Sequence, residues 1–257
     1  MHLRARLQTG VWQLRSFRLL ISASMVSIFG SLITVTAFPF IAINALDAGP
    51  ADLALLSLAG IVPGALLGSV AGVWVERRPP KIVMITADLT CALALLTVPL
   101  LWWAGSLSMG LLLAVALVTS LAELGFRVAD RTLLPSVVGR EQIESANATL
   151  SGGSALAEAG GFSFGGLLIQ VLNGPLALLV DVFSFIGSAI LLSRIRIDVP
   201  ITSEDEEQNH THWRTALREG IQYLRQSPVL SPLAGSLFLQ AAGMEAIGTV
   251  YFLFVNK

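Results

Sequence analysis

Acidic side chains lie inside long apolar stretches of this sequence, where an ion is costly. Glu158 is the clearest case, because on a helix it lies about 20 Å from Ser145, where its apolar stretch begins. It shares a stripe, at spacings of four, three and four, with Asn147, Ser151 and Ser154. A charge at the centre of a bilayer costs about 2.5–3.5 kcal/mol on insertion scales and is usually kept only where it faces a cavity or a partner. Glu158 is therefore either a carboxylate that takes up protons or a cation, or a protonated acid hydrogen-bonded to a neighbouring helix, and both interpretations stay open.

Further charged groups in the apolar stretches also allow more than one interpretation. Glu123 and Arg127 lie one helical turn apart, so they can pair on one face. We favour a structural ion pair over a functional role for them. Asp88 lies about two turns into its stretch, where it either joins Glu76 and Arg77 as a latch or is a solvated acid near the lipid headgroups.

Glycines recur at four-residue spacing in two of the apolar stretches. On a helix this spacing lines them up in a groove without side chains, against which a neighbouring backbone can pack closely. The first groove ends in the charged turn Glu76-Arg77-Arg78-Pro79-Pro80-Lys81, and the pattern indicates a helix that slides against another helix. The two sets are Gly60, Gly64, Gly68 and Gly72, and Gly153, Gly161 and Gly165 with Ala157 between them.

The elements that carry these residues are predicted to be membrane-spanning helices. Of the 257 residues, 54% are hydrophobic and 13% are charged, whereas a soluble domain has about a quarter charged residues. Seven stretches are long enough to cross about 30 Å of hydrocarbon, so the predicted fold class is an all-α polytopic membrane protein. The net charge of −1 gives no indication of nucleic acid as a partner, and the single Cys91 excludes an internal disulfide. The predicted spans cover residues 19–45, 52–75, 82–103, 107–127, 145–172, 175–193 and 229–255.

The basic residues predict the orientation of these helices. In the predicted topology, all of the 16 Lys and Arg residues except Lys257 fall on one side of the membrane. Cytoplasmic segments are enriched in Lys and Arg, which places the N-terminus in the cytoplasm and the chain in the cell membrane. The predicted organisation is a cytoplasmic arm (1–18), a six-helix bundle (19–193), a cytoplasmic loop with an amphipathic helix (194–228) and a seventh helix (229–257).

The sequence predicts neither a metal site nor a cofactor. His210 and His212 lie beside the amphipathic helix, but no third ligand is near them in the sequence. All 3 histidines lie outside the spans, and no nucleophile has an adjacent base. We therefore do not expect an enzyme.

Several segments carry a resemblance to a known family. The loop signature between helices two and three of the major facilitator superfamily resembles Gly72-Val-Trp-Val-Glu76-Arg77-Arg78-Pro79-Pro80-Lys81. The Gly-Pro-x-x-Gly-Gly signature of its antiporter branches is similar to Gly161-Phe162-Ser163-Phe164-Gly165-Gly166. Its macrolide-efflux branch, which includes siderophore exporters, resembles Leu134-Pro135, Ala146-Asn147-Ala148, Val180-Asp181-Val182-Phe183-Ser184-Phe185 and Leu217-Arg218-Glu219-Gly220-Ile221-Gln222-Tyr223-Leu224.

The resemblance implies a fold of twelve helices in two six-helix halves, each made of inverted three-helix repeats, with the substrate path between the halves. The chain is then truncated: it supplies the first half and helix seven, and a second six-helix half is expected as a partner. Helices two and five of such proteins face the other half, so both glycine grooves would lack their partners here. Asp181 matches an acid of the family and is a second candidate for proton coupling, although we favour a structural role for it.

The predicted function is export of hydrophobic or amphipathic compounds, such as drugs or siderophores, by alternating access driven by protons. By the resemblance, the charged turn between the second and third helices closes the cytoplasmic side, while Glu158 or another buried acid senses protons. The alternative is a truncated or split half-transporter that has no activity alone and assembles with a second half. The expected partners are an amphipathic small molecule, protons and the lipid bilayer. The residues of the predicted gate are Gly72, Glu76, Arg77, Lys81 and Asp88.

Overall fold

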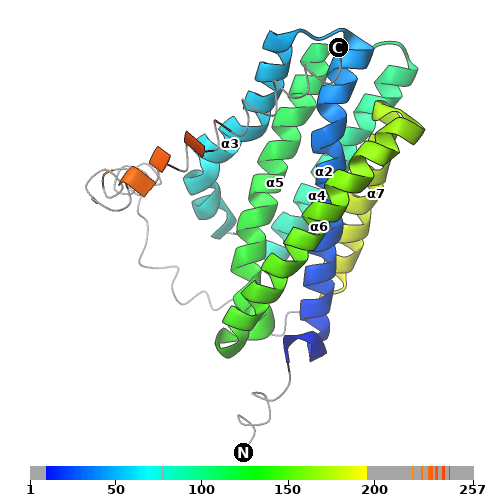
Figure 1. Cartoon of the computed structure of the whole chain (residues 1–257). Helices are drawn as coiled ribbons and strands as arrows, with labels where there is room; N and C mark the ends of the chain where they lie inside the picture. Colours follow the sequence, from blue (N-terminus) through cyan, green and yellow to red (C-terminus); the bar gives the residue numbers. More distant parts are fainter. Residues whose placement is uncertain are drawn as a thin grey trace, which may run out of the picture.

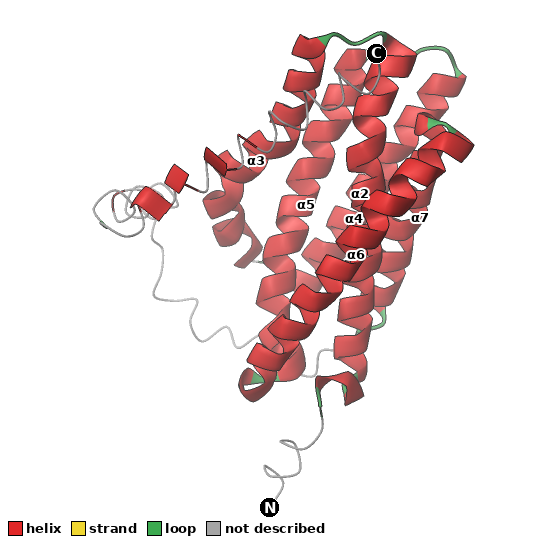
Figure 2. Cartoon of the chain, viewed as in Figure 1, coloured by secondary structure: helices red, strands yellow, loops and turns green. Residues whose placement is uncertain are grey.

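The structure is a computed structural model that describes residues 10–76 and 78–195, together with scattered residues between 222 and 243. Long α-helices dominate residues 10–195, and no strand occurs among the described residues (Figure 2). Two short 3-10 helices, η1 (Val11–Gln13) and η2 (Arg140–Gln142), precede α2 and α6. The long helices are α2 (Arg15–Leu46), α3 (Pro50–Glu76), α4 (Pro80–Trp103), α5 (Met109–Val138), α6 (Ile143–Leu172) and α7 (Gly174–Ser193).

These helices have the length and composition of membrane spans. Five of the described helices, α2 and α4 to α7, are long and apolar enough to cross a membrane, and the described part of α3 is apolar from Pro50 to Gly64. The predicted fold class, an all-α polytopic membrane protein, is therefore confirmed. The first six predicted spans each correspond to one of the long helices.

Local sequence sets the ends of these helices. Asp47 (φ 49°) ends α2 and Asn173 (φ 67°) ends α6 in the left-handed region, which short polar side chains tolerate better than most. Pro50, Pro80 and Pro175 lie in the first turns of α3, α4 and α7, where a missing N–H removes no helical hydrogen bond. The connections that result are short, so consecutive helices run in opposite directions through the bundle (Figure 1).

Helix α2 lies at the centre of the bundle. It packs against α7 and α6, and less extensively against α5 (Figure 1). Helix α4 packs between α5 and α7, and α3 packs mainly against α5. Two apolar clusters fill the interior, one around Ile33, Leu95 and Leu178 and the other around Phe17, Met84 and Leu133.

Helix α5 is longer than predicted. The sequence predicted a span that ends at residue 127 and a connecting segment over 128–144, whereas α5 continues to Val138. Asp130 and the two polar residues after it interrupt the apolar run, but Ala129 and Leu133 extend its buried face. Because burial of one face is enough to hold a helix, the polar residues do not end it.

Other predicted segments lie outside the described residues. These are the first nine residues of the arm, Arg77, the Glu76 side chain and almost the whole 196–228 segment with its predicted amphipathic helix. Most of the predicted seventh span, 229–255, lies outside them as well. The predicted division into arm, bundle, loop and seventh helix therefore stays a prediction.

The two glycine sets have different surroundings. A Cβ atom built on Gly161 would lie 2.8 Å from the Cβ of Leu32, so only glycine allows α6 to approach α2 this closely. Gly153 and Gly165 also face α2, through Met25 and Thr36. The prediction that both glycine grooves lack partners is therefore wrong for α6, because its groove packs on the central helix of the same bundle. On α3, a Cβ atom would meet no described atom within 4 Å at Gly60, Gly64, Gly68 or Gly72.

Candidate functional site

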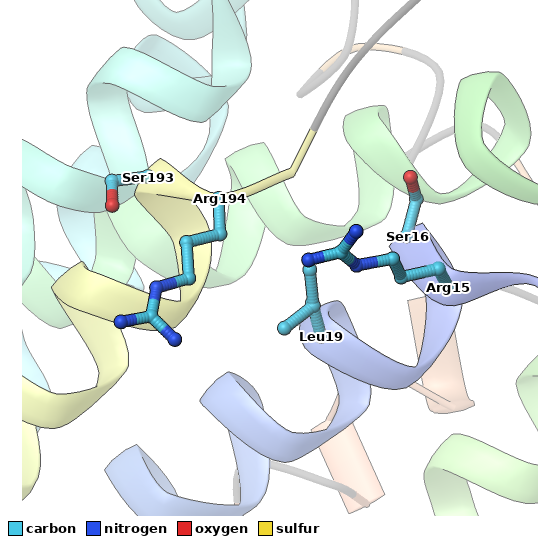
Figure 3. A pocket seen from close by; sticks show the side chains of 5 residues that line it. All are labelled: Arg15, Ser16, Leu19, Ser193 and Arg194. Atoms are coloured by element: carbon cyan, nitrogen blue, oxygen red, sulfur yellow. The ribbon is translucent and has the colours of Figure 1, made fainter.

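Basic residues gather at one end of the bundle, which we call the basic end. Arg15, Ser16 and Leu19 of α2 line a pocket of about 320 Å³ together with Ser193 and Arg194 at the end of α7 (Figure 3). The two arginine side chains extend from different helices at this pocket. The sequence predicts Arg15 and Arg194 on the same side of the membrane, and in the bundle both lie at the same end.

Lys81 joins the start of α4 to the end of α7 at the basic end. Its Nζ atom donates hydrogen bonds to the carbonyl oxygens of Ser193 (2.8 Å) and Ile195 (2.7 Å). A cation suits this position because the last carbonyl groups of a helix have no partners within the helix and carry partial negative charge. Whether Lys81 also acts with Gly72 and Glu76 as a gate stays a prediction, because the Glu76 side chain and Arg77 lie outside the described residues.

A row of hydroxyl groups on α2 meets acidic side chains from neighbouring helices. Ser24 donates a hydrogen bond to Asp130 Oδ1 (3.3 Å), and Ser31 donates one to Glu123 Oε1 (3.0 Å), so both link α2 to α5. Arg127 pairs with the other carboxylate oxygen of Glu123 at 3.4 Å. The Arg127 side chain is 60% exposed and that of Glu123 is 30% exposed. This pair therefore lies at an open face of the bundle between α2 and α5, and its role stays a prediction.

Asp181 is enclosed between α2 and α7. It is fully buried, and both of its carboxylate oxygens accept hydrogen bonds, one from Thr34 and one from Ser184 (2.8 Å). Gly30 makes this contact possible, because a Cβ atom there would overlap Ser184 Oγ and Asp181 Oδ1. Through these hydrogen bonds Asp181 holds α7 against α2. Proton coupling by Asp181 stays a prediction.

Asp88 lies inside the bundle on α4. Its side chain is 1% exposed, so the interpretation of Asp88 as a solvated acid near the headgroups is wrong. The reason is the packing of α4 between α5 and α7, which turns this face of the helix inward. The hydroxyl groups of Ser188 and Ser27 are its polar neighbours inside the bundle.

Glu158 lies on the outside of the bundle. It is exposed together with Asn147 and Ser151, while Ser154 is half-buried. The only buried residues of α6 are Ala146, Gly161, Gly165 and Ile169. No described residue forms a hydrogen bond or an ion pair with Glu158. The interpretation as an acid hydrogen-bonded to a neighbouring helix therefore finds no partner in the described part of the chain.

Sequence reasoning missed Asp130. This residue lies seven positions after Glu123, on the same face of α5, and contacts the same serine row of α2. The spacing would have identified it if the helix had been predicted to continue past residue 127. Among the residues that the structure describes, no group of three or more His, Cys, Asp and Glu side chains is placed to hold a metal ion.

Comparisons with known proteins identify the family. A family profile described as Major Facilitator Superfamily matches residues 20–257. The chain is 26% identical over 94% of its length to YvqJ, and 24% identical over 82% to YfiS, both named uncharacterized MFS-type transporters of Bacillus subtilis (strain 168). It is also 27% identical over 93% of its length to y4rN of Sinorhizobium fredii, which has the same description.

The chain spans about half the length of these relatives, namely 58%, 49% and 57% of them. No solved structure matches it. The profile covers nearly the whole chain, and the described helices form a multi-pass bundle with polar groups on its open faces. The protein therefore belongs to the major facilitator superfamily of membrane transporters.

Proposed function

We propose that this chain works as the N-terminal six-helix unit of a proton-driven exporter of hydrophobic or amphipathic compounds, such as drugs or siderophores. It would lie in the cytoplasmic membrane with its N-terminus and the basic end in the cytoplasm, because Lys and Arg are enriched on that side. Arg15, Lys81 and Arg194 gather at that end in support of this orientation. The compound would move by alternating access along the open faces of the bundle.

The observation that carries the proposal is the position of Glu158. It is exposed in the middle of α6, a helix of 30 residues with membrane-span character. Placing the charged Glu158 side chain in lipid would cost about 2.5–3.5 kcal/mol. Its surroundings are therefore expected to be water or another protein surface. A carboxylate that faces a water-filled path between two halves can take up a proton on one side of the membrane and release it on the other.

The open faces of α2, α5 and α6 suit an amphipathic compound. Arg127 and Glu123 contribute a polar pair, and Ser151 and Asn147 add neutral hydrogen-bonding groups beside Glu158. One turn beyond Glu158 on the same face, α6 exposes the large apolar side chain of Phe162, which would contact the apolar part of the compound.

A second candidate function is that of a half-transporter without activity of its own, which assembles with a second six-helix half. One observation favours it: a Cβ atom at any glycine of the α3 row would meet no described atom within 4 Å. Small residues in such a row allow another helix to approach closely, so a second bundle could pack there.

Transport measurements in inverted membrane vesicles test both candidates. The chain would be expressed alone and joined to the part of YvqJ outside the aligned 247 residues. We expect an acid-inside gradient to accelerate entry of a fluorescent amphipathic dye, because inversion turns export into uptake. Gradient-driven entry with the joined protein only would favour the half-transporter. If, under the gradient, the dye enters vesicles that hold either protein no faster than vesicles that hold neither, proton-driven export is excluded.

A further inference from the structure

The pocket at the basic end has no part in the transport path proposed above. Arg15 of α2 and Arg194 at the end of α7 line it, and its other lining residues, Ser16, Leu19 and Ser193, carry no charge (Figure 3). Neither arginine forms an ion pair with a carboxylate in the part of the chain that the structure describes. Two positive charges at one pocket repel each other and attract an anion, so the pocket favours an anionic ligand.

We propose that this pocket binds the phosphodiester headgroup of one anionic phospholipid, whose acyl chains lie along the sides of α2 and α7. Arginine suits such a ligand, because its planar guanidinium group donates two parallel hydrogen bonds to two phosphate oxygens. Basic pockets between membrane helices bind anionic headgroups in this way. The pocket is separate from Glu158 in the middle of α6, so the inference does not depend on the proposed export of compounds.

The pocket lies at the depth of the lipid headgroups. Arg15 is the first residue of α2 and Arg194 directly follows α7, so both arginines lie at the ends of helices with membrane-span character. Trp12, in η1 just before α2, is exposed, and its ring packs edge-on against Phe17 with 6.2 Å between the ring centroids. Tryptophan is enriched at the membrane–water interface, at the level of the headgroups. A lipid phosphate at its normal depth is therefore level with both guanidinium groups.

Apolar side chains continue from the pocket along both helices. On α7, the exposed Ile186 and Ile190 share one face with the pocket arginine at spacings of four residues. On α2, Leu19 lines the pocket, and the exposed Val26 lies two turns further on the same face. The two rows adjoin, because a Cβ atom built on Gly187 would lie 4.0 Å from Cγ1 of Val26. A soluble phosphate compound would leave these side chains uncovered, whereas the acyl chains of a lipid would cover them.

The end of α7 is held in place by α4. Lys81 donates hydrogen bonds to the carbonyl oxygens of Ser193 and Ile195, which flank Arg194 on both sides. These bonds also occupy carbonyl groups whose partial negative charge would repel a phosphate. The backbone of Arg194 is therefore positioned before a lipid binds, and less conformational freedom is lost on binding.

The test is native mass spectrometry of the purified full chain in detergent micelles, titrated with phosphatidylglycerol or phosphatidylcholine. Both lipids have a phosphodiester and two acyl chains, but only phosphatidylglycerol has a net negative charge. We expect one molecule of phosphatidylglycerol to bind at least about tenfold more tightly than phosphatidylcholine, since two arginines favour the anion. Arg15→Gln and Arg194→Gln should each weaken phosphatidylglycerol binding about tenfold, the loss expected for one hydrogen bond to a charged group.

A matched variant and a soluble competitor keep the test decisive. Arg18→Gln removes an exposed arginine of the same helix that does not line the pocket, and it should bind phosphatidylglycerol like the parent. Glycerol 3-phosphate has the phosphate without acyl chains and should not displace the lipid at equal concentration. Displacement by glycerol 3-phosphate would identify a soluble phosphate compound as the ligand and overturn the lipid proposal.

Two other results would also overturn the proposal. One is equal affinity of the parent for the two lipids, and the other is parent-like binding of phosphatidylglycerol by Arg15→Gln and Arg194→Gln. Both arginines are exposed, so their replacement is not expected to unfold the bundle. Either variant decides the case if the other does not fold.

Discussion

An imposed proton gradient is expected to lose its effect on export when Glu158 is replaced by glutamine. Glutamine keeps the size and the hydrogen-bonding groups of a protonated glutamate but cannot ionise. A proton carrier is therefore fixed in its loaded form, whereas an acid with a merely structural role is hardly disturbed. We expect the dye flux of Glu158→Gln under an acid-inside gradient to fall to the flux measured without a gradient.

The vesicle assay can separate coupling from general damage. Glu144→Gln is the matched control, because Glu144 is an exposed acid in the first turn of the same helix. This control should keep the response to the gradient. Binding of the dye, measured by fluorescence anisotropy, should persist in both variants. If Glu158→Gln still exports faster with the gradient, Glu158 is not the coupling group, and Asp181 or Glu123 becomes the next residue to test.

Replacing Gly30 by alanine is expected to destabilise the bundle, although alanine favours helices over glycine by about 1 kcal/mol. The new Cβ atom would overlap the groups of Asp181 and Ser184 that hold α7 to α2, and it would lie 2.8 Å from the Cβ of Ser184. Insertion of extra atoms in a packed core costs about 1–3 kcal/mol. Loss of hydrogen bonds to a buried carboxylate would add to this cost. We expect a net loss of about 2 kcal/mol in the free energy of unfolding.

The glycine row of α3 supplies the control. Gly60→Ala introduces the same methyl group where no described atom lies within 4 Å. That variant should be as stable as the parent, or more stable by up to about 1 kcal/mol. Unfolding by SDS titration in detergent micelles, followed by tryptophan fluorescence, measures both. Equal stability changes for Gly30→Ala and Gly60→Ala would contradict the close contact between α2 and α7.

The helices were predictable because span length and apolar composition are local properties of the chain. The end of α5 was not, since its last eleven residues depend on burial of Ala129 and Leu133 against other helices. The glycine row of α6 was recognised, but its partner was not. Gly161 packs on Leu32 of α2, about 130 positions earlier in the chain, and spacing alone cannot identify such a contact.

The polar groups show the same limit. Ser24 and Ser31 of α2 donate hydrogen bonds to Asp130 and Glu123 of α5, which lie 106 and 92 positions later in the chain. Which hydroxyl group meets which acid depends on how α2 and α5 cross, and that arrangement is not encoded in local spacing. For Asp88 the sequence left open a latch with Glu76 and Arg77 or a solvated acid near the headgroups, whereas the side chain is buried in the bundle where α4 packs between α5 and α7. The position of a residue along its helix can thus be predicted from the sequence. The side to which its side chain points depends on the helices packed around it and cannot be predicted in the same way.

The central claim is that the polar stripe of α6 lines a water-filled path. Its most direct test is cysteine labelling in intact membranes, in a background where Cys91, the single cysteine, is replaced by alanine. A membrane-impermeant maleimide reacts with thiols in water and not with thiols in lipid. Ser151→Cys and Glu158→Cys lie on the stripe, and Leu156→Cys lies between them in depth on the opposite face. We predict labelling at 151 and 158 and none at 156, with all three labelled after denaturation. Labelling at 156 together with no reaction at 151 and 158 would contradict the claim, because the stripe would then face lipid or packed protein.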